Sequence, residues 1–300
     1  MYEDFGTILN RGFKTWVRNL NICIPFVLNF FANLILSIFF FAIIGVLYLA
    51  GSTNLIDPAA LSNEELYSLL WEGFTNNIGS SIILILAFFL FGMLLQAFFT
   101  SGAIGMAKKA SETGDTVFSD IFRSGSRNAF RMFLTNLMLA LISLAGIVFV
   151  VPGALIIGDL GSLIENPKIP VEGMGILGMG ILLWTVYLLA INIVFSIAPY
   201  ALVIDELDPL ESLKTGYGFF RENKFDVFFI WIITIGLAFF NSLISEVLGT
   251  QSVLISGITS FVPILVLSPL TAILWTRLYL VGKDRKLYDP YDLLSDPEGF

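Results

Sequence analysis

The sequence predicts an all-α polytopic membrane protein with six transmembrane helices in three hairpins, each preceded by a cytoplasmic amphipathic elbow helix. The first observation is composition: 56% of the 300 residues are hydrophobic and only 13% are charged, whereas a soluble domain carries about 25% charged residues. The second is that the apolar residues are gathered into six long runs. The third is a short motif of glycine, aromatic and basic residues that recurs ahead of these runs.

Each of the six apolar runs is long enough to cross a membrane. A hydrocarbon core of ~30 Å needs about 20 apolar residues in a helix. The runs that qualify are residues 21–50, 78–107, 132–157, 175–204, 227–249 and 253–282. The last two are so close in sequence that we expect a tight hairpin. We interpret residues 1–283 as a single transmembrane domain and the polar residues 284–300 as a flexible cytoplasmic tail.

The basic residues lie on one side of these runs. Of the 16 Lys and Arg residues, only Lys168 falls in a connection on the other side. The positive-inside rule therefore predicts a multi-pass plasma-membrane protein whose N-terminus and C-terminus are both cytoplasmic. In the first outer connection, Ser62 and Glu65 fit a capping box that begins an apolar helical pattern. We predict a short helix on the outer membrane surface, with a lid over a pore or ligand as the alternative.

The motif that precedes the first run recurs before the fifth. Residues 9–19 read LNRGFKTWVRN and residues 213–223 read LKTGYGFFREN. When the two are aligned on their first glycines, an aspartate lies eight residues upstream in each, Asp4 and Asp208. Each aspartate is placed to cap a helix N-terminus. The pattern predicts two equivalent elbow helices that turn the chain into the membrane.

A weaker copy, FRSGSRNAFRM, occupies residues 122–132, and we place its cap at Thr116. With it, the chain reads as three tandem units of one elbow helix and one transmembrane hairpin. Aligning the copies superimposes Gly12, Gly125 and Gly216. We interpret the glycine of the elbow as a close-packing point where the helix crosses a neighbour.

The elbows place cations and aromatic residues on opposite faces, which is typical of helices in the membrane interface. Each cation near an anionic leaflet contributes about 1 kcal/mol to membrane binding. One hypothesis is that the elbows form a shared site for lipid headgroups or for a partner. The simpler alternative is that they only anchor and orient the hairpins. The predicted headgroup-binding residues are Arg11, Lys14, Arg18, Arg123, Arg127, Arg131, Lys214 and Arg221.

The middle of each run lacks Asp, Glu, Lys and Arg, which disfavours proton- or sodium-coupled transport. Arg277 lies near the inner end of the sixth run, and we expect its side chain to snorkel to the interface. The uncharged amides in the runs either bond between helices or converge on a polar cavity. These polar intramembrane residues are Asn29, Asn33, Gln96, Asn136, Asn192 and Asn241.

Small residues and prolines predict local features of the spans. Close helix packing is expected at Ser101, Gly102 and Gly105 in the second run, and at Gly175, Gly178 and Gly180 in the fourth. Interior prolines break or kink a membrane helix because its freed carbonyls need new partners. Pro263 and Pro269 make the sixth run the best candidate for an irregular helix.

Several classes of chemistry are disfavoured by the composition. The chain has one cysteine and no histidine, which excludes internal disulfides, histidine-based triads and HExxH zinc sites. No P-loop or GxSxG motif is present. The acidic group around Asp205 already has a helix-capping explanation, so we expect no metal site. We therefore expect no enzyme activity, no cofactor and no nucleic-acid partner.

The block APYALVIDELDPLESLKTGYGFFRENKFDVFFI, residues 198–230, resembles a poorly characterised group of prokaryotic six-span proteins. The group includes YciC-like proteins and the membrane domain found ahead of some glycerophosphoryl diester phosphodiesterases. Gly216 replaces a serine that is usual in that pattern. The resemblance implies a membrane location and a link to envelope lipids, without the phosphodiesterase activity. The residues that carry it are Glu211, Leu213, Lys214, Tyr217, Arg221 and Asn223.

The sequence favours a non-enzymatic protein that interacts with membrane lipids or acts as a scaffold for another membrane protein or a second copy of itself. The alternative is a transporter or permease-like component for a lipid or an uncharged small solute, and an intramembrane enzyme is the third hypothesis. A polar cavity lined by Asn29, Asn33, Asn136 and Asn192 would favour the transporter.

Overall fold

The computed structural model describes residues 3–49, 62–157, 171–249 and 253–288. These residues are helical and contain no strand. Six of the helices are long and apolar enough to cross a membrane, so the protein is an all-α polytopic membrane protein as predicted. Residues 50–61, Lys168 and the tail after residue 288 lie outside the described part of the chain.

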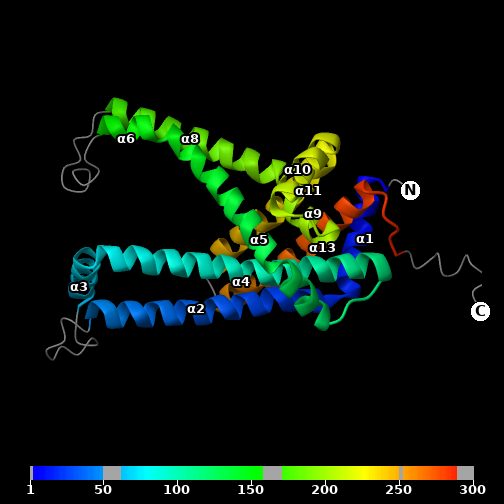
Figure 1. Ribbon diagram of the computed structural model, residues 1–300, viewed down its shortest axis with the longest axis horizontal. Helices are drawn as coiled ribbons and strands as arrows, with labels where there is room; N and C mark the ends of the chain where they lie inside the picture. Colours follow the sequence, from blue (N-terminus) through cyan, green and yellow to red (C-terminus); the bar gives the residue numbers. More distant parts are fainter. Residues whose placement is uncertain (1–2, 50–61, 158–170, 250–252, 289–300) are drawn as a thin grey trace, which may run out of the picture.

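The first hairpin and its elbow follow the prediction closely. The Asp4 carboxylate accepts from the Thr7 backbone N–H at 3.3 Å, which confirms the predicted cap. The capping box of Ser62 and Glu65 is also confirmed. In Figure 1, α2 and α4 run side by side and α3 lies across their far end. The elements are α1 (Phe5–Arg18), η1 (Leu20–Cys23), α2 (Ile24–Leu49), α3 (Asn63–Asn76) and α4 (Ile78–Thr113).

The second unit differs from the prediction at its start. Residues 122–132 form no separate elbow, because nothing between them and the span breaks the helix, and they become the first turns of α5. Thr116 does not cap that helix; its hydroxyl bonds to the Asp120 carboxylate instead, at 3.0 Å. The chain then breaks before Pro199, which has no N–H to continue α8. The elements are α5 (Ser119–Ala145), η3 (Gly146–Phe149), α6 (Val151–Ile157), α8 (Val171–Val194) and α9 (Ala198–Asp205).

The third unit has a separate elbow helix and an irregular last span. Asp208 occupies the N-cap position of this elbow, but its side chain makes no capping hydrogen bond, so that part of the prediction is wrong. The irregular sixth span is confirmed, since a π-helical turn begins at Pro263. The elements are α10 (Pro209–Glu222), α11 (Lys224–Gly249), α12 (Val253–Val262), η4 (Pro263–Leu267) and α13 (Ser268–Gly282).

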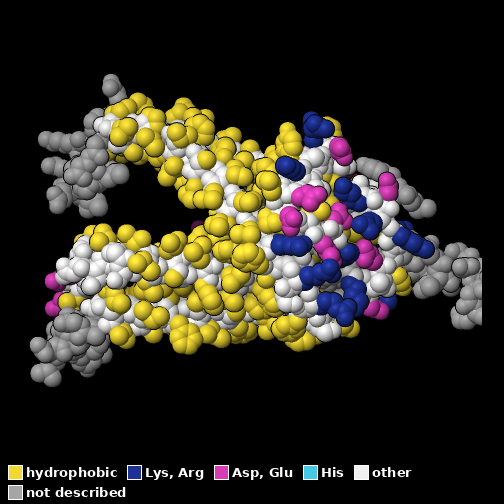
Figure 2. All heavy atoms as spheres, in the orientation of Figure 1, with side chains coloured by type: hydrophobic (Ala, Val, Ile, Leu, Met, Phe, Trp, Pro, Cys, Tyr) yellow, Lys and Arg dark blue, Asp and Glu magenta, His cyan; other side chains and the backbone are white. Residues whose placement is uncertain are grey.

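The hairpins diverge from a common base. Figure 1 shows the α2–α4 hairpin and the arm of α5, α6 and α8 separating from the end that carries the labelled N-terminus. Figure 2 shows hydrophobic side chains along both arms and most Lys and Arg side chains at the base. The buried core also lies at the base, where α13 packs with α1 and α9 around Tyr279 and Leu202. The exposed apolar arms are therefore the surfaces suited to face lipid.

The aligned glycines of the elbows are all crossing points. A Cβ atom on Gly12 would lie 2.7 Å from Leu274 Cδ2, and one on Gly216 would lie 2.9 Å from the Ala198 backbone nitrogen. On Gly125 it would lie 3.0 Å from the Phe98 carbonyl oxygen. These contacts place α1 against α13, α5 against α4, and α10 against α9. Each elbow region thus packs on the second span of another hairpin.

The predicted small-residue contacts are confirmed on α4 but only in part on α8. A Cβ on Gly102 would lie 2.8 Å from Ile121 Cγ2, and a Cβ on Gly105 would collide with the Ser124 side chain. The helices α4 and α5 therefore approach closely. Gly180 backs onto the Phe149 backbone. Gly175 and Gly178 have no neighbour within 4 Å, so close packing there was a wrong prediction. The reason is that α8 packs mainly on α6 and η3, which leaves these positions open.

Arg277 does not snorkel. Its side chain is 1% exposed and donates to the Glu3 carboxylate from Nε at 2.9 Å and from one terminal nitrogen at 2.6 Å. Arg11 donates to the same carboxylate at 2.8 Å. An ion pair of this geometry needs no interface, because the carboxylate replaces the water that the guanidinium has lost.

Candidate functional site

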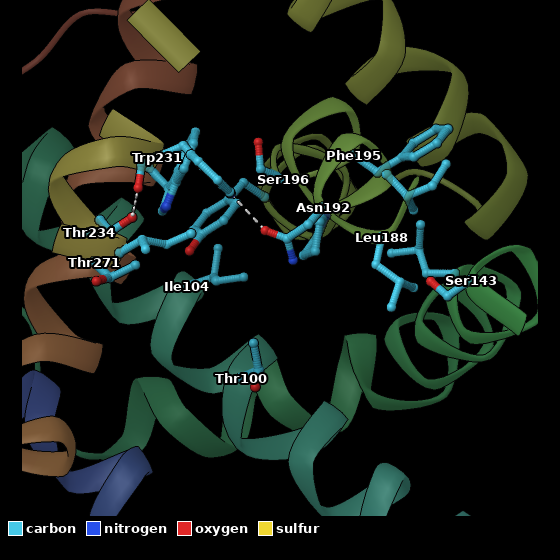
Figure 3. Close-up of a pocket in the computed structure, with 16 residues that line it drawn as sticks. Thr100, Ile104, Ser143, Leu188, Asn192, Phe195, Ser196, Trp231, Thr234 and Thr271 are labelled. Carbon is cyan, nitrogen blue, oxygen red and sulfur yellow. Dashed lines mark hydrogen bonds between the residues drawn. The ribbon is translucent and has the colours of Figure 1, made fainter. Parts of the chain in front are cut away.

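A pocket of 530 Å³ lies between the spans where the arms meet the base. Its walls come from α4, α5, α8, α9, α11 and α13, and from the break between α8 and α9 (Figure 3). Among the residues that the structure describes, no Asp, Glu, Lys or Arg lines it. The polar lining consists of hydroxyl groups, one amide and two indoles, from Thr100, Ser143, Asn192, Ser196, Tyr200, Trp231, Thr234, Thr271 and Trp275.

A second pocket, of 480 Å³, adjoins the first. It reaches toward α2 and the π-helical turn, and Phe26 and Pro263 form part of its wall. The two pockets have six lining residues in common, so they are neighbouring compartments of one hollow in the membrane domain. The shared residues are Thr100, Ile104, Tyr200, Thr234, Ile235 and Thr271.

The polar groups of this hollow fall into two kinds. Some are already satisfied: Trp231 Nε1 donates to Asn192 Oδ1 at 2.8 Å, and the Thr234 hydroxyl donates to the Trp231 carbonyl at 3.0 Å (Figure 3). Others have no hydrogen bond to the described residues, namely the hydroxyls of Thr100, Tyr200 and Thr271. These three line both compartments, so an occupant of either one meets hydroxyls that are free to bond.

The structure does not bring the predicted amides together. Asn192 lines the first compartment and Asn241 the second. Asn33 instead donates to Asn29 Oδ1 at 2.9 Å within α2. The two remaining amides lie outside both compartments, with Gln96 exposed and Asn136 half-buried. The polar groups of the hollow are mainly hydroxyls that sequence reasoning did not select, because Ser and Thr in a span more often bond to their own helix.

Half of the predicted headgroup-binding cations already have partners in the protein. Arg11 pairs with Glu3 and Arg18 with Asp115, at 2.8 and 3.3 Å. The other engaged cations are Arg127, which pairs with Glu206, and Arg131, whose guanidinium lies 3.7 Å from Asp208. Four exposed cations have no ion pair with the described residues: Lys14, Arg123, Lys214 and Arg221.

The acidic group near residue 205 is also engaged. The Asp205 carboxylate accepts from the Tyr279 hydroxyl at 2.6 Å and from Arg285 at 3.1 Å. Glu206 and Asp208 lie against Arg127 and Arg131 of α5. Among the described residues, no three acidic or cysteine side chains are grouped as metal ligands.

Comparison with known proteins places the chain among proteins of unknown role. A family described as a domain of unknown function, DUF7847, matches residues 32–282. An uncharacterized protein of Archaeoglobus fulgidus is 27% identical over 250 residues, which cover 79% of this chain and 80% of that protein. No solved structure matches. These matches fit a poorly characterised family, and they do not support the narrower resemblance to YciC-like proteins or to the phosphodiesterase membrane domain.

Proposed function

The chain belongs to the DUF7847 family, and from that premise we propose that it is a non-enzymatic, lipid-interacting protein of a prokaryotic plasma membrane. Its interhelical hollow would hold part of a lipid. Both termini would be cytoplasmic, since the Lys and Arg side chains gather at the base that carries α1 and the end of α13 (Figure 2).

The observation that carries this proposal is the set of free hydroxyls of Thr100, Tyr200 and Thr271 in a hollow whose described lining is uncharged and mostly apolar. Lipid tails are as apolar as the lining, so the lining by itself gives a bound chain no advantage over the bilayer. Hydrogen bonds made inside the membrane contribute about 0.6–2 kcal/mol each. The preferred occupant is therefore an apolar chain that carries an uncharged oxygen, such as an ester, an ether or a hydroxyl group.

A transporter or permease-like component for a lipid or uncharged solute is the second candidate. The observation that favours it is that two compartments adjoin, one reaching Ser143 on α5 and the other reaching Phe26 on α2. A molecule able to enter one compartment would pass the shared hydroxyls to enter the other. The lack of charge in both compartments restricts such a route to uncharged groups.

The proposal is tested by native mass spectrometry of the full chain released from phosphatidylglycerol nanodiscs. The Thr100→Val and Thr271→Val variants remove hydroxyls with little change in volume. Each should weaken lipid retention about threefold to thirtyfold, the equivalent of one membrane hydrogen bond. The control is Thr185→Val, since the Thr185 side chain is exposed on α8 and bonds to its own helix at Ile181.

Retention that is equal in all three variants would count against the hollow as a lipid site. The same spectra report whether a second copy of the chain is bound. Movement of a fluorescent lipid across liposomes containing the protein separates the two candidates, because retention without accelerated movement favours binding alone.

A further inference from the structure

We propose that the protein has a second binding site, a basic pocket at the base of the molecule that holds a phosphate group. The pocket has a volume of 160 Å³ and lies between α4, α5 and α9. It has no lining residue in common with the interhelical hollow, so it goes beyond the lipid-chain site proposed above. Its lining residues are Gly105, Lys108, Lys109, Asp120, Arg123, Ser124, Arg127, Asn128, Val203 and Glu206.

Close packing of two helices builds this pocket. Gly105 on α4 backs onto Ser124 on α5, and Gly125 backs onto Phe98 with no room for a side chain between them. This contact brings the cations that follow Gly105 on α4 beside those that flank Ser124 on α5. The basic groups are thus held by rigid helices, which is the arrangement that a defined anion site requires.

The charge of the pocket favours an anion. Four cations face two carboxylates, which leaves two positive charges in excess. Lys109 pairs with Asp120 at 2.9 Å, and Arg127 pairs with Glu206. Lys108 donates to the Ile204 carbonyl at 2.8 Å, which fixes its ammonium group at the wall without neutralising it.

Arg123 is the group best placed to take a ligand. It is exposed, and it makes no hydrogen bond or ion pair with the described residues. Its planar guanidinium can present two parallel N–H donors to a phosphate. The Lys108 ammonium lines the same pocket. One phosphate group can therefore bind both the Lys108 ammonium and the Arg123 guanidinium.

Asn128 gives an independent indication that something binds here. Its side chain is only 3% exposed, and its Nδ2 donates to the Ser124 carbonyl at 3.1 Å. Its Oδ1 is buried and has no hydrogen-bond partner in the described chain. A buried acceptor of this kind costs stability unless a donor reaches it. A phosphate monoester supplies that donor through its P–OH group when singly protonated.

The size of the pocket agrees with this ligand. At 160 Å³, the pocket is large enough to admit a phosphate group. The pocket lies at the base, where the apolar part of α4 ends, so its ligand can be the phosphate of a lipid headgroup or a soluble phosphate. Both sources present the same chemistry to Lys108 and Arg123.

The test uses the full chain and two probes. One arm measures binding of inorganic phosphate to the detergent-solubilised protein by calorimetry. The other compares nanodiscs of phosphatidylcholine with and without phosphatidic acid by native mass spectrometry. Binding in the first arm identifies a soluble ligand, and binding in the second arm alone identifies a lipid headgroup. No binding of either probe would overturn the proposal.

The decisive variant is Arg123→Gln, which should weaken binding of the effective probe by about tenfold or more, because charge-assisted hydrogen bonds are lost. Lys14→Gln is the control, since it removes one exposed charge from α1, which lies at the same end of the molecule (Figure 1). Equal losses in the two variants would mean diffuse attraction to a basic surface and would refute a built site. Arg123→Lys retains the charge but loses the two parallel donors, so it should bind more weakly than wild type and more tightly than Arg123→Gln, an order that misfolding would not produce. None of these changes should alter the lipid-chain retention that depends on Thr100 and Thr271, so the two proposals can fail separately.

Discussion

Arg277, near the C-terminal end of the last span, holds the carboxylate of Glu3, near the start of the chain, through two hydrogen bonds of 2.9 and 2.6 Å. The pair joins residues 274 positions apart, and both side chains are almost completely buried. It therefore fixes the segment before α1 to the core of the base. Removing one partner leaves the other charge buried without compensation.

The Glu3→Gln variant should lower the free energy of unfolding by about 3–5 kcal/mol, the usual cost of breaking a buried ion pair. Glu64→Gln serves as the control because Glu64 is exposed on α3. Chemical unfolding in detergent measures both. The double variant Glu3→Leu with Arg277→Met should recover much of the loss, since replacing both charges removes the desolvation cost. A Glu3→Gln protein as stable as wild type would contradict a structural role for this pair.

A matched pair of glycines in α10 tests the crossing of the elbows. Gly216→Ala places a methyl group 2.9–3.0 Å from the backbone of Ala198, so it should destabilise the protein by about 1–3 kcal/mol through overpacking. Gly218, two residues later, has no neighbour within 4 Å. Gly218→Ala should leave stability unchanged or raise it by up to about 1 kcal/mol, because alanine favours the helix. Thermal unfolding of the two variants gives the comparison, and equal shifts would refute the crossing.

The features that depend on local pattern were predictable from the sequence. The six spans follow from apolar runs, the α1 cap follows from Asp4, and the crossing at Gly12 follows from the recurring motif. The mistaken elbow at residues 122–132 also had a local signal. No proline interrupts the sequence from Ser119 to Ala145, so one continuous helix was the simpler interpretation.

The features that depend on tertiary contact were not predictable. The hydroxyls of Thr100, Tyr200 and Thr271 come from three helices that only the folded bundle brings together. Nothing near Arg277 in sequence indicates that its partner is Glu3, and a charge near a span end ordinarily reaches water. The pairing of Arg127 with Glu206 likewise depends on α5 lying beside α9.

The predicted orientation is testable with single cysteines. Two single-cysteine variants are made in a Cys23→Ser background. Ser68→Cys places an exposed thiol on α3, at one end of the first hairpin, and Thr113→Cys places one at the end of α4, at the opposite end. With the termini in the cytoplasm, a membrane-impermeant maleimide added to intact cells should label position 68 and not position 113. Disruption of the cells should expose position 113. The reverse pattern would invert the topology and move the basic pocket to the outer face.

Two tyrosines on neighbouring elements distinguish a ligand-binding hydroxyl from a structural one. The Tyr279 hydroxyl donates to Asp205 at 2.6 Å in the core of the base, so Tyr279→Phe should cost about 1.5–3 kcal/mol of stability, as expected for a hydrogen bond to a charged group. The Tyr200 hydroxyl has no partner in the described chain and lines both compartments of the hollow.

Tyr200→Phe should therefore leave unfolding unchanged while reducing lipid retention about threefold to thirtyfold, since only a bound molecule uses that hydroxyl. Unfolding in detergent and native mass spectrometry from phosphatidylglycerol nanodiscs supply the two measurements. A Tyr200→Phe protein that loses stability but retains lipid normally would show that the hydroxyl serves the fold. In that case the hollow would need another explanation than lipid binding, because its free hydroxyls are what distinguish it from the surrounding bilayer.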